Sequence, residues 1–166
     1  RLLATEDLIV EHKKVKTASF DVSRRLLVLP MWERASDSVY DLLVGHEVGH
    51  ALFTPDEDPP KGIPHQFINV TEDARIEKLI KRKYLGLAKT FFRGYRELND
   101  DDFFQIADEE VDEMNLADRA NLFFKIGNFV DISFTEEEQE IIDQIRDAET
   151  FADACAAAKV LYDYCK

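Results

Sequence analysis

The chain has 166 residues, of which 45% are hydrophobic, and a formal net charge of −13. This length and composition can bury one sizeable core. There is no run of about 18 apolar residues and no secretory-type start, so no membrane association is expected. The acidic balance argues against direct nucleic-acid binding and serves solubility first, although it would also attract a basic partner. Because the chain starts with Arg1 rather than Met, we expect a further domain outside this fragment.

Two short strands are predicted near the N-terminus. Residues 16–21 and 25–30 each mix apolar with polar side chains, and residues 22–24 form the turn between them. Together they predict a small antiparallel β-sheet, which is expected to pack on the helix that follows.

The next segment predicts a helix that carries metal ligands. Ser36 is a good N-cap, and Pro55 ends the apolar run. Within this helix stands the pattern His46-Glu47-Val48-Gly49-His50. Residues four apart share a helix face, so both imidazoles can bind one metal ion. Glu47 is offset around the turn and is placed to take a proton from a water. The alternative is a core helix with two buried, hydrogen-bonded histidines.

Two glycines interrupt this helix next to the histidines. Gly45 and Gly49 each cost about 1 kcal/mol of helix stability relative to alanine. Glycines at such positions indicate that another backbone or a substrate passes close to the helix.

A second helix is predicted over residues 66–80, after a Pro-rich loop. Glu72 lies 22 residues beyond His50, which leaves room for the second helix to pack antiparallel to the first. A carboxylate from it would complete a His-His-Glu set and leave one zinc position open for water. We favour Glu72 as this ligand, with Asp73 as the alternative ligand or as a partner of a ligand imidazole. Glu77 is interpreted as a solvated acid that pairs with Arg75 or Lys78.

The segments 45–54 and 69–77 together resemble a known family. Their residues, GHEVGHALFT and NVTEDARIE, are similar to the gluzincin-type metallopeptidase domain. The resemblance is to the branch of this family found in cobaltochelatase-T-subunit-like proteins and in tailed-phage proteins. In that branch the domain often stands ahead of a von Willebrand-type domain. The resemblance covers about residues 15–98. It departs from the family pattern at Leu85, where a proline is expected, which leaves the site untouched. It implies a zincin-like zinc hydrolase in which the Glu of the Asn-x-x-Glu-Asp-x-Arg motif, here Glu72, is the third ligand.

Further site residues follow from what zinc peptidases of this kind do. An edge strand of their small sheet pairs with an extended substrate, and the candidate strand here is Thr17, Ala18, Ser19, Phe20 and Asp21. Such enzymes often add a hydrogen-bond donor opposite the metal. The candidates are His65, Tyr84 and Tyr95, although His65 reads more simply as a residue near solvent at a helix start.

The C-terminal half is expected to be helical. Residues 116–129 and 150–165 carry apolar side chains at helical spacing, and Thr135 with Glu138 forms a capping box. Cys155 and Cys165 would lie about 15 Å apart on one helix, too far for a disulfide, which indicates free thiols and a cytoplasmic protein (of the host cell if phage-encoded). The expected fold is α+β and predominantly α, with a zincin-like core over residues 1–98 and a helical extension of the same domain over 99–166.

These observations predict a metallopeptidase with one catalytic Zn²⁺ and a protein or peptide substrate. Zinc lowers the pKa of its bound water to about 7, and Glu47 is the expected general base. The first alternative is a metal-binding but catalytically weak scaffold or regulatory module of a larger phage or chelatase-like protein. The second is an interaction protein in which zinc only stabilises the fold.

Overall fold

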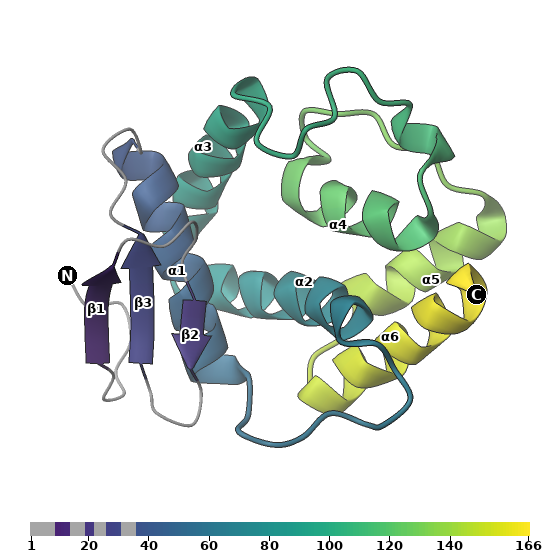
Figure 1. Ribbon diagram of the computed structural model, residues 1–166, viewed down its shortest axis with the longest axis horizontal. Helices are drawn as coiled ribbons and strands as arrows, with labels where there is room; N and C mark the ends of the chain where they lie inside the picture. The colour runs from purple at the N-terminus through teal and green to yellow at the C-terminus, as the bar shows by residue number, and fades with distance from the viewer. Residues whose placement is uncertain (1–8, 14–18, 22–25, 31–35) are drawn as a thin grey trace. The chain divides into compact units, whose positions relative to one another are not determined.

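The computed structural model describes residues 9–13, 19–21, 26–30 and 36–166, with side chains described from residue 36 onward (Figure 1). Six α-helices follow one another in this last part. Their bounds are α1 Asp37–Phe53, α2 His65–Lys83, α3 Leu87–Asp100, α4 Leu116–Ile126, α5 Glu136–Arg146 and α6 Phe151–Cys165. A short 3-10 turn, η1, occupies Val111–Glu113. No helix in the part of the chain that the structure describes is long and apolar enough to cross a membrane.

Three short strands precede α1: β1 (Ile9–Lys13), β2 (Ser19–Asp21) and β3 (Leu26–Pro30). Their order in the sheet is β1-β3-β2 (Figure 1). β1 runs parallel to β3, with Ile9 opposite Leu26, whereas β2 runs antiparallel to β3, with Ser19 opposite Val28. The sheet is therefore mixed, and both β2 and β3 contact α1.

The predicted α+β class with an antiparallel sheet is wrong. Residues 36–166, the part whose side chains the structure describes, are all-α and contain no strand. The strands before them do not form the expected sheet, because β1 joins the free side of β3 in parallel. A pattern read along neighbouring residues favours a hairpin, since it carries no information about a pairing partner more distant in the chain.

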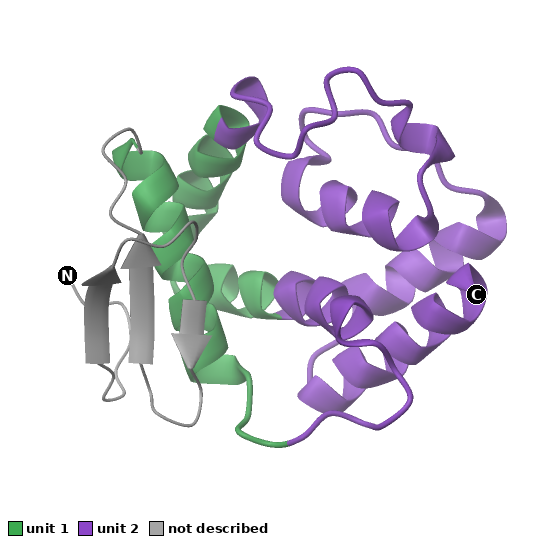
Figure 2. Cartoon of the chain, viewed as in Figure 1, with its two compact units in different colours: residues 1–57, 76–97 green, residues 58–75, 98–166 purple. Residues whose placement is uncertain are grey.

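The chain divides into two compact units, shown in different colours in Figure 2. Unit 1 comprises residues 1–57 and 76–97, and unit 2 comprises residues 58–75 and 98–166. The division falls within α2, so this single helix contributes its first half to unit 2 and its second half to unit 1. The predicted zincin-like core over residues 1–98, with a helical extension of the same domain over residues 99–166, stays a prediction.

Unit 1 is organised by close helix contacts. The Ser36 hydroxyl at the start of α1 donates to Glu97 near the end of α3. Nearer the C-terminus of α1, Gly45 faces the Phe91 ring in the first half of α3. Because later residues of α1 meet earlier residues of α3, the two helices run antiparallel. Phe91 is fully buried and its ring also lies under the Lys81 ammonium group of α2, 5.5 Å from the ring centroid.

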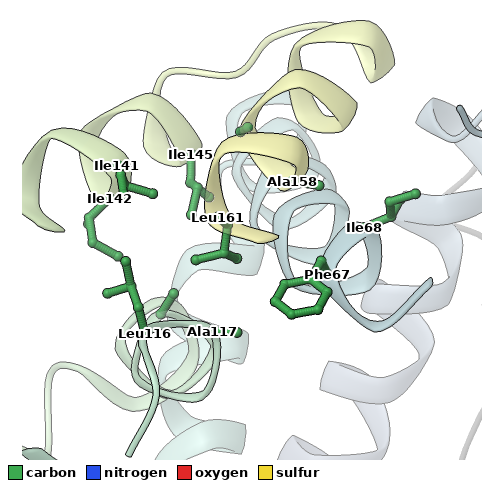
Figure 3. Packing of buried hydrophobic residues seen from close by; sticks show 11 residues of the cluster. Phe67, Ile68, Leu116, Ala117, Ile141, Ile142, Ile145, Ala158 and Leu161 are labelled. Carbon is green, nitrogen blue, oxygen red and sulfur yellow. The ribbon is translucent and has the colours of Figure 1, made fainter. Parts of the chain in front are cut away.

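Unit 2 has its own hydrophobic core. Side chains from the first half of α2 and from α4, α5 and α6 converge in it (Figure 3). Its members are Phe67, Ile68, Leu116, Ala117, Ala120, Ile141, Ile142, Ile145, Ala157, Ala158 and Leu161. The Thr71 hydroxyl, fully buried, donates to the Ala154 carbonyl at 2.8 Å and so ties α2 to α6.

A buried ion pair joins α4 to α5 in unit 2. The Arg119 guanidinium donates to both carboxylate oxygens of Glu138, at 3.0 and 2.5 Å, and also to the carbonyls of Met114 and Ser133. These bonds hold the loop before α5 against α4. Arg119 holds the pKa of Glu138 down at about 2, compared with an ordinary value of 4.5.

Several predicted helix signals are confirmed. Ser36 caps α1 by accepting from the Val39 amide, and the Thr135–Glu138 capping box begins α5. Cys155 and Cys165 both lie on α6, and neither forms a disulfide. Helix α3 has no counterpart among the predicted elements.

Candidate metal centre

The two histidines of the motif lie on one face of α1. His46 and His50 are four residues apart in this uninterrupted helix, and their ring centroids are 4.9 Å apart. Both rings are partly buried, and Glu47 between them is 9% exposed. At 100° per residue, Glu47 points to one side of the histidine face.

Small residues let two other helices approach this part of α1. A Cβ on Gly49 would lie 2.9 Å from Ile76 Cδ1 and 3.4 Å from the Ile76 carbonyl oxygen of α2. A Cβ on Gly45 would lie 2.7 Å from Phe91 Cε1 of α3. The prediction that another backbone or a substrate passes close to the helix is confirmed for a backbone at Gly49, where α2 lies against α1, whereas Gly45 faces a side chain.

The carboxylates of α2 complete the cluster. Asp73 and Glu77 are four residues apart on one continuous helix and therefore share a face. Glu77 binds His46, so this face is the one turned toward the histidines. Ligand atoms of His46, His50 and Asp73 all lie within 4.8 Å of one another. No other group of three such side chains meets this spacing among the described residues.

Each imidazole is oriented through its Nδ1 atom. His46 Nδ1 lies 2.6 Å from Glu77 Oε2, and His50 Nδ1 lies 2.8 Å from Thr54 Oγ1 at the end of α1. An ionised carboxylate can only accept, so His46 donates from Nδ1 and carries its lone pair on Nε2. A metal ion would therefore bind Nε2 of His46, and it would bind Nε2 of His50 when that ring donates from Nδ1 to the Thr54 hydroxyl oxygen. Such hydrogen bonds fix the tautomer and the ring orientation of a metal-ligating histidine.

Glu77 is a residue of this cluster that sequence reasoning missed. It is 4% exposed, and it accepts hydrogen bonds from His46 and from the Tyr95 hydroxyl, the latter at 2.5 Å. The interpretation of Glu77 as a solvated acid is wrong, because its side chain is buried. The available signal was its position four residues after Asp73, the same spacing that places His50 after His46.

The Tyr95 hydroxyl contacts Glu77, which is not the contact predicted for it. It was expected as a donor opposite the metal, whereas its buried hydroxyl donates to Glu77 and orients that carboxylate.

The two candidate third ligands have different partners. Glu72 is 3% exposed, and both of its oxygens accept from Arg75, at 2.6 and 2.7 Å. Asp73 is less buried and pairs with the Lys125 ammonium group of α4 at 3.2 Å. A bidentate guanidinium–carboxylate pair is stronger than a single long ammonium contact. The cluster with the histidines contains Asp73, which the sequence analysis kept as the alternative.

The remaining predicted site residues lie away from this cluster along the chain. His65 is the exposed first residue of α2, about 12 Å along the helix axis from Asp73. Tyr84 follows the end of α2, about 10 Å along the axis from Glu77. Its hydroxyl oxygen is buried and has no hydrogen-bond partner among the described residues. The roles of both as hydrogen-bond donors stay predictions.

The predicted substrate strand is described only in part. Thr17 and Ala18 lie outside the described residues, whereas Ser19, Phe20 and Asp21 form β2. β2 is an edge strand of the sheet.

Comparisons with known proteins add no relative. No protein-family model, curated protein or solved structure matches the chain.

Proposed function

We propose that this chain is a zinc-dependent metallopeptidase whose metal is held by His46, His50 and Asp73. The observation that carries the proposal is the cluster of His46, His50 and Asp73, in which both imidazoles are held at Nδ1 and so leave Nε2 for a metal. Two imidazoles and one carboxylate are a typical donor set for catalytic zinc. The resemblance to gluzincin-type peptidases supports the same conclusion, and the predicted cytoplasmic location stays part of the proposal.

A bound zinc ion would supply Lewis-acid chemistry, polarising the scissile carbonyl and lowering the pKa of water. The chain itself supplies the proton transfers. Glu47 accepts a proton from the attacking water on its carboxylate and passes it to the leaving amine.

Asp73 is the third ligand in this proposal, and Glu72 stays the competing prediction. Recruiting Glu72 to a metal would weaken its buried bidentate pair with Arg75. Recruiting Asp73 would disturb its contact with Lys125, in which both side chains are 18% exposed. The smaller cost favours Asp73.

The position of β2 supports a peptide as the substrate. Its outer side is a sheet edge, and an extended peptide can add to such an edge through backbone hydrogen bonds. These bonds do not depend on side-chain identity, so they leave sequence preference to other contacts.

The test measures metal content and peptide cleavage in the same samples. Wild-type protein should contain about one zinc per chain by elemental analysis and should digest casein in a chelator-sensitive way. Glu47→Gln should keep the metal and lose cleavage, whereas His46→Ala should lose both. Asp73→Asn should lose metal while Glu72→Gln retains it, if Asp73 is the ligand.

Two outcomes contradict the proposal. Full cleavage activity in Glu47→Gln would exclude the assigned base. Metal binding without cleavage in the wild type would instead select the scaffold or regulatory alternative, and unfolding on chelation would then select the structural-zinc alternative.

A further inference from the structure

The net negative charge of this chain comes from one of its two units. Unit 2 contains 22 Asp and Glu against 7 Lys and Arg, whereas unit 1 contains 12 against 14. Residues 76–97 alone hold seven of the 21 basic residues and only two acidic ones. Unit 1 is therefore not acidic, and the end of α2 with α3 forms a strongly basic segment.

Both carboxylates of this segment have described hydrogen-bond partners. Glu77 is buried against His46 and Tyr95, and Glu97 accepts from the Ser36 hydroxyl. The exposed cations on α3 are Lys89, Arg93 and Arg96, which share one helix face through their spacing of four and three residues, and the exposed Asp100 ends the helix four residues after Arg96. Lys89 and Arg96 lie about 10 Å apart along the helix axis. Arg82 and Lys83, at the end of α2, are also exposed.

Large apolar side chains accompany these charges. Leu85, in the turn between α2 and α3, is 80% exposed, the highest value among the large exposed hydrophobic residues described. Phe92 lies on α3 next to Arg93 and is 44% exposed. Arginine and aromatic residues are enriched in protein interfaces, where apolar anchors contribute most of the affinity.

We propose that this basic face, defined by Arg82, Lys83, Leu85, Lys89, Phe92, Arg93 and Arg96, docks an acidic protein segment that carries apolar side chains. Charge complementarity selects the acidic partner, and Leu85 and Phe92 select one with apolar groups. Carboxylates three or four residues apart on a helical partner match the spacing of the α3 cations. The surface is independent of the metal centre, so the inference does not rest on the proposed function.

The same observations disfavour longer polyanions. A nucleic acid or an anionic bilayer extends well beyond a face of this size, and unit 2 of the same molecule carries a net charge of −15.

The experiment uses a fluorescein-labelled synthetic peptide in which pairs of Glu alternate with single Leu residues. Fluorescence anisotropy should show binding that weakens as salt is raised, and little binding of the version with Gln in place of Glu. The double variant Lys89→Glu/Arg93→Glu should weaken binding by about tenfold or more. Leu85→Ser should weaken it without changing the salt dependence.

A charge-matched control separates docking from net charge. Lys61→Glu/Lys166→Glu makes the same charge change at two exposed positions of unit 2 and should bind the peptide as the wild type does. Equal loss in both double variants would overturn the proposal, as would absence of peptide binding. Tighter binding of a single-stranded oligonucleotide, or of phosphatidylserine vesicles, would overturn it in favour of that partner. Circular dichroism and metal content of the variants check that they are folded.

Discussion

Glu77→Gln tests whether the buried carboxylate sets the metal affinity of the site. Gln keeps the shape of Glu77 and one acceptor oxygen but removes the negative charge that faces His46 Nδ1 at 2.6 Å. Loss of such a histidine partner typically costs 10–100-fold in metal affinity, which corresponds to roughly 1.4–2.7 kcal/mol. We expect the upper half of this range, because Glu77 is only 4% exposed and water cannot replace its charge. Tyr95→Phe removes one donor to Glu77 and should cost less, about fivefold.

Competition with a chromophoric zinc chelator measures these affinities directly. Glu57→Gln, the same chemical change at an exposed position of unit 1, serves as the control and should bind zinc as the wild type does. Thermal unfolding followed by circular dichroism shows whether each variant is folded at the assay temperature. A folded Glu77→Gln protein with zinc affinity within twofold of the wild type would refute the reasoning, since His46 would then be oriented without Glu77.

Two further predictions concern stability. Gly45→Ala should destabilise the chain by about 1–3 kcal/mol, because the added Cβ would meet the buried Phe91 ring. The control Gly86→Ala, at a position with open space around it, should change the free energy of unfolding by less than about 0.5 kcal/mol. Urea unfolding measures both changes. The pKa of Glu138 is about 2 in the folded chain and 4.5 ordinarily, so its pair with Arg119 stabilises the fold fully above pH 4.5 and loses that contribution as the pH falls toward 2. The difference in the free energy of unfolding between the wild type and Glu138→Gln should shrink by about 3 kcal/mol over this range, and a constant difference would contradict the assignment.

Sequence patterns predicted the features of α1 that depend only on residues close together in the chain. The capping residue Ser36 and the breaker Pro55 bracket α1 within a residue or two of its observed ends, because both act on the backbone next to them. The spacing of His46 and His50 likewise needs only helical geometry to bring the rings together. Gly45 and Gly49 indicated that another helix passes close by, since a missing side chain has a cost that packing must offset.

The same patterns failed where a partner comes from elsewhere in the chain. Glu77 has Arg75 and Lys78 as sequence neighbours, which made a solvated acid the simpler interpretation, but Arg75 is engaged by Glu72. The side of α2 that turns toward α1 decides which of its carboxylates is buried. Sequence spacing gives the relative angle of Glu72, Asp73 and Glu77 but not the absolute one. For the same reason β1 escaped prediction, since its pairing with β3 depends on a partner beyond the intervening β2.

The candidate metal centre consists of two residue pairs with the same spacing along their helices. His46 and His50 on α1 face Asp73 and Glu77 on α2, and both pairs are four residues apart. A ligand and its supporting carboxylate therefore lie one turn apart on α2, and both are positioned by the same packing of α2 on α1. Changes in the length of the loop between Thr54 and His65 leave these pairs intact. One residue inserted between Asp73 and Glu77 would instead rotate one carboxylate by about 100° and remove either the third ligand or the partner of His46.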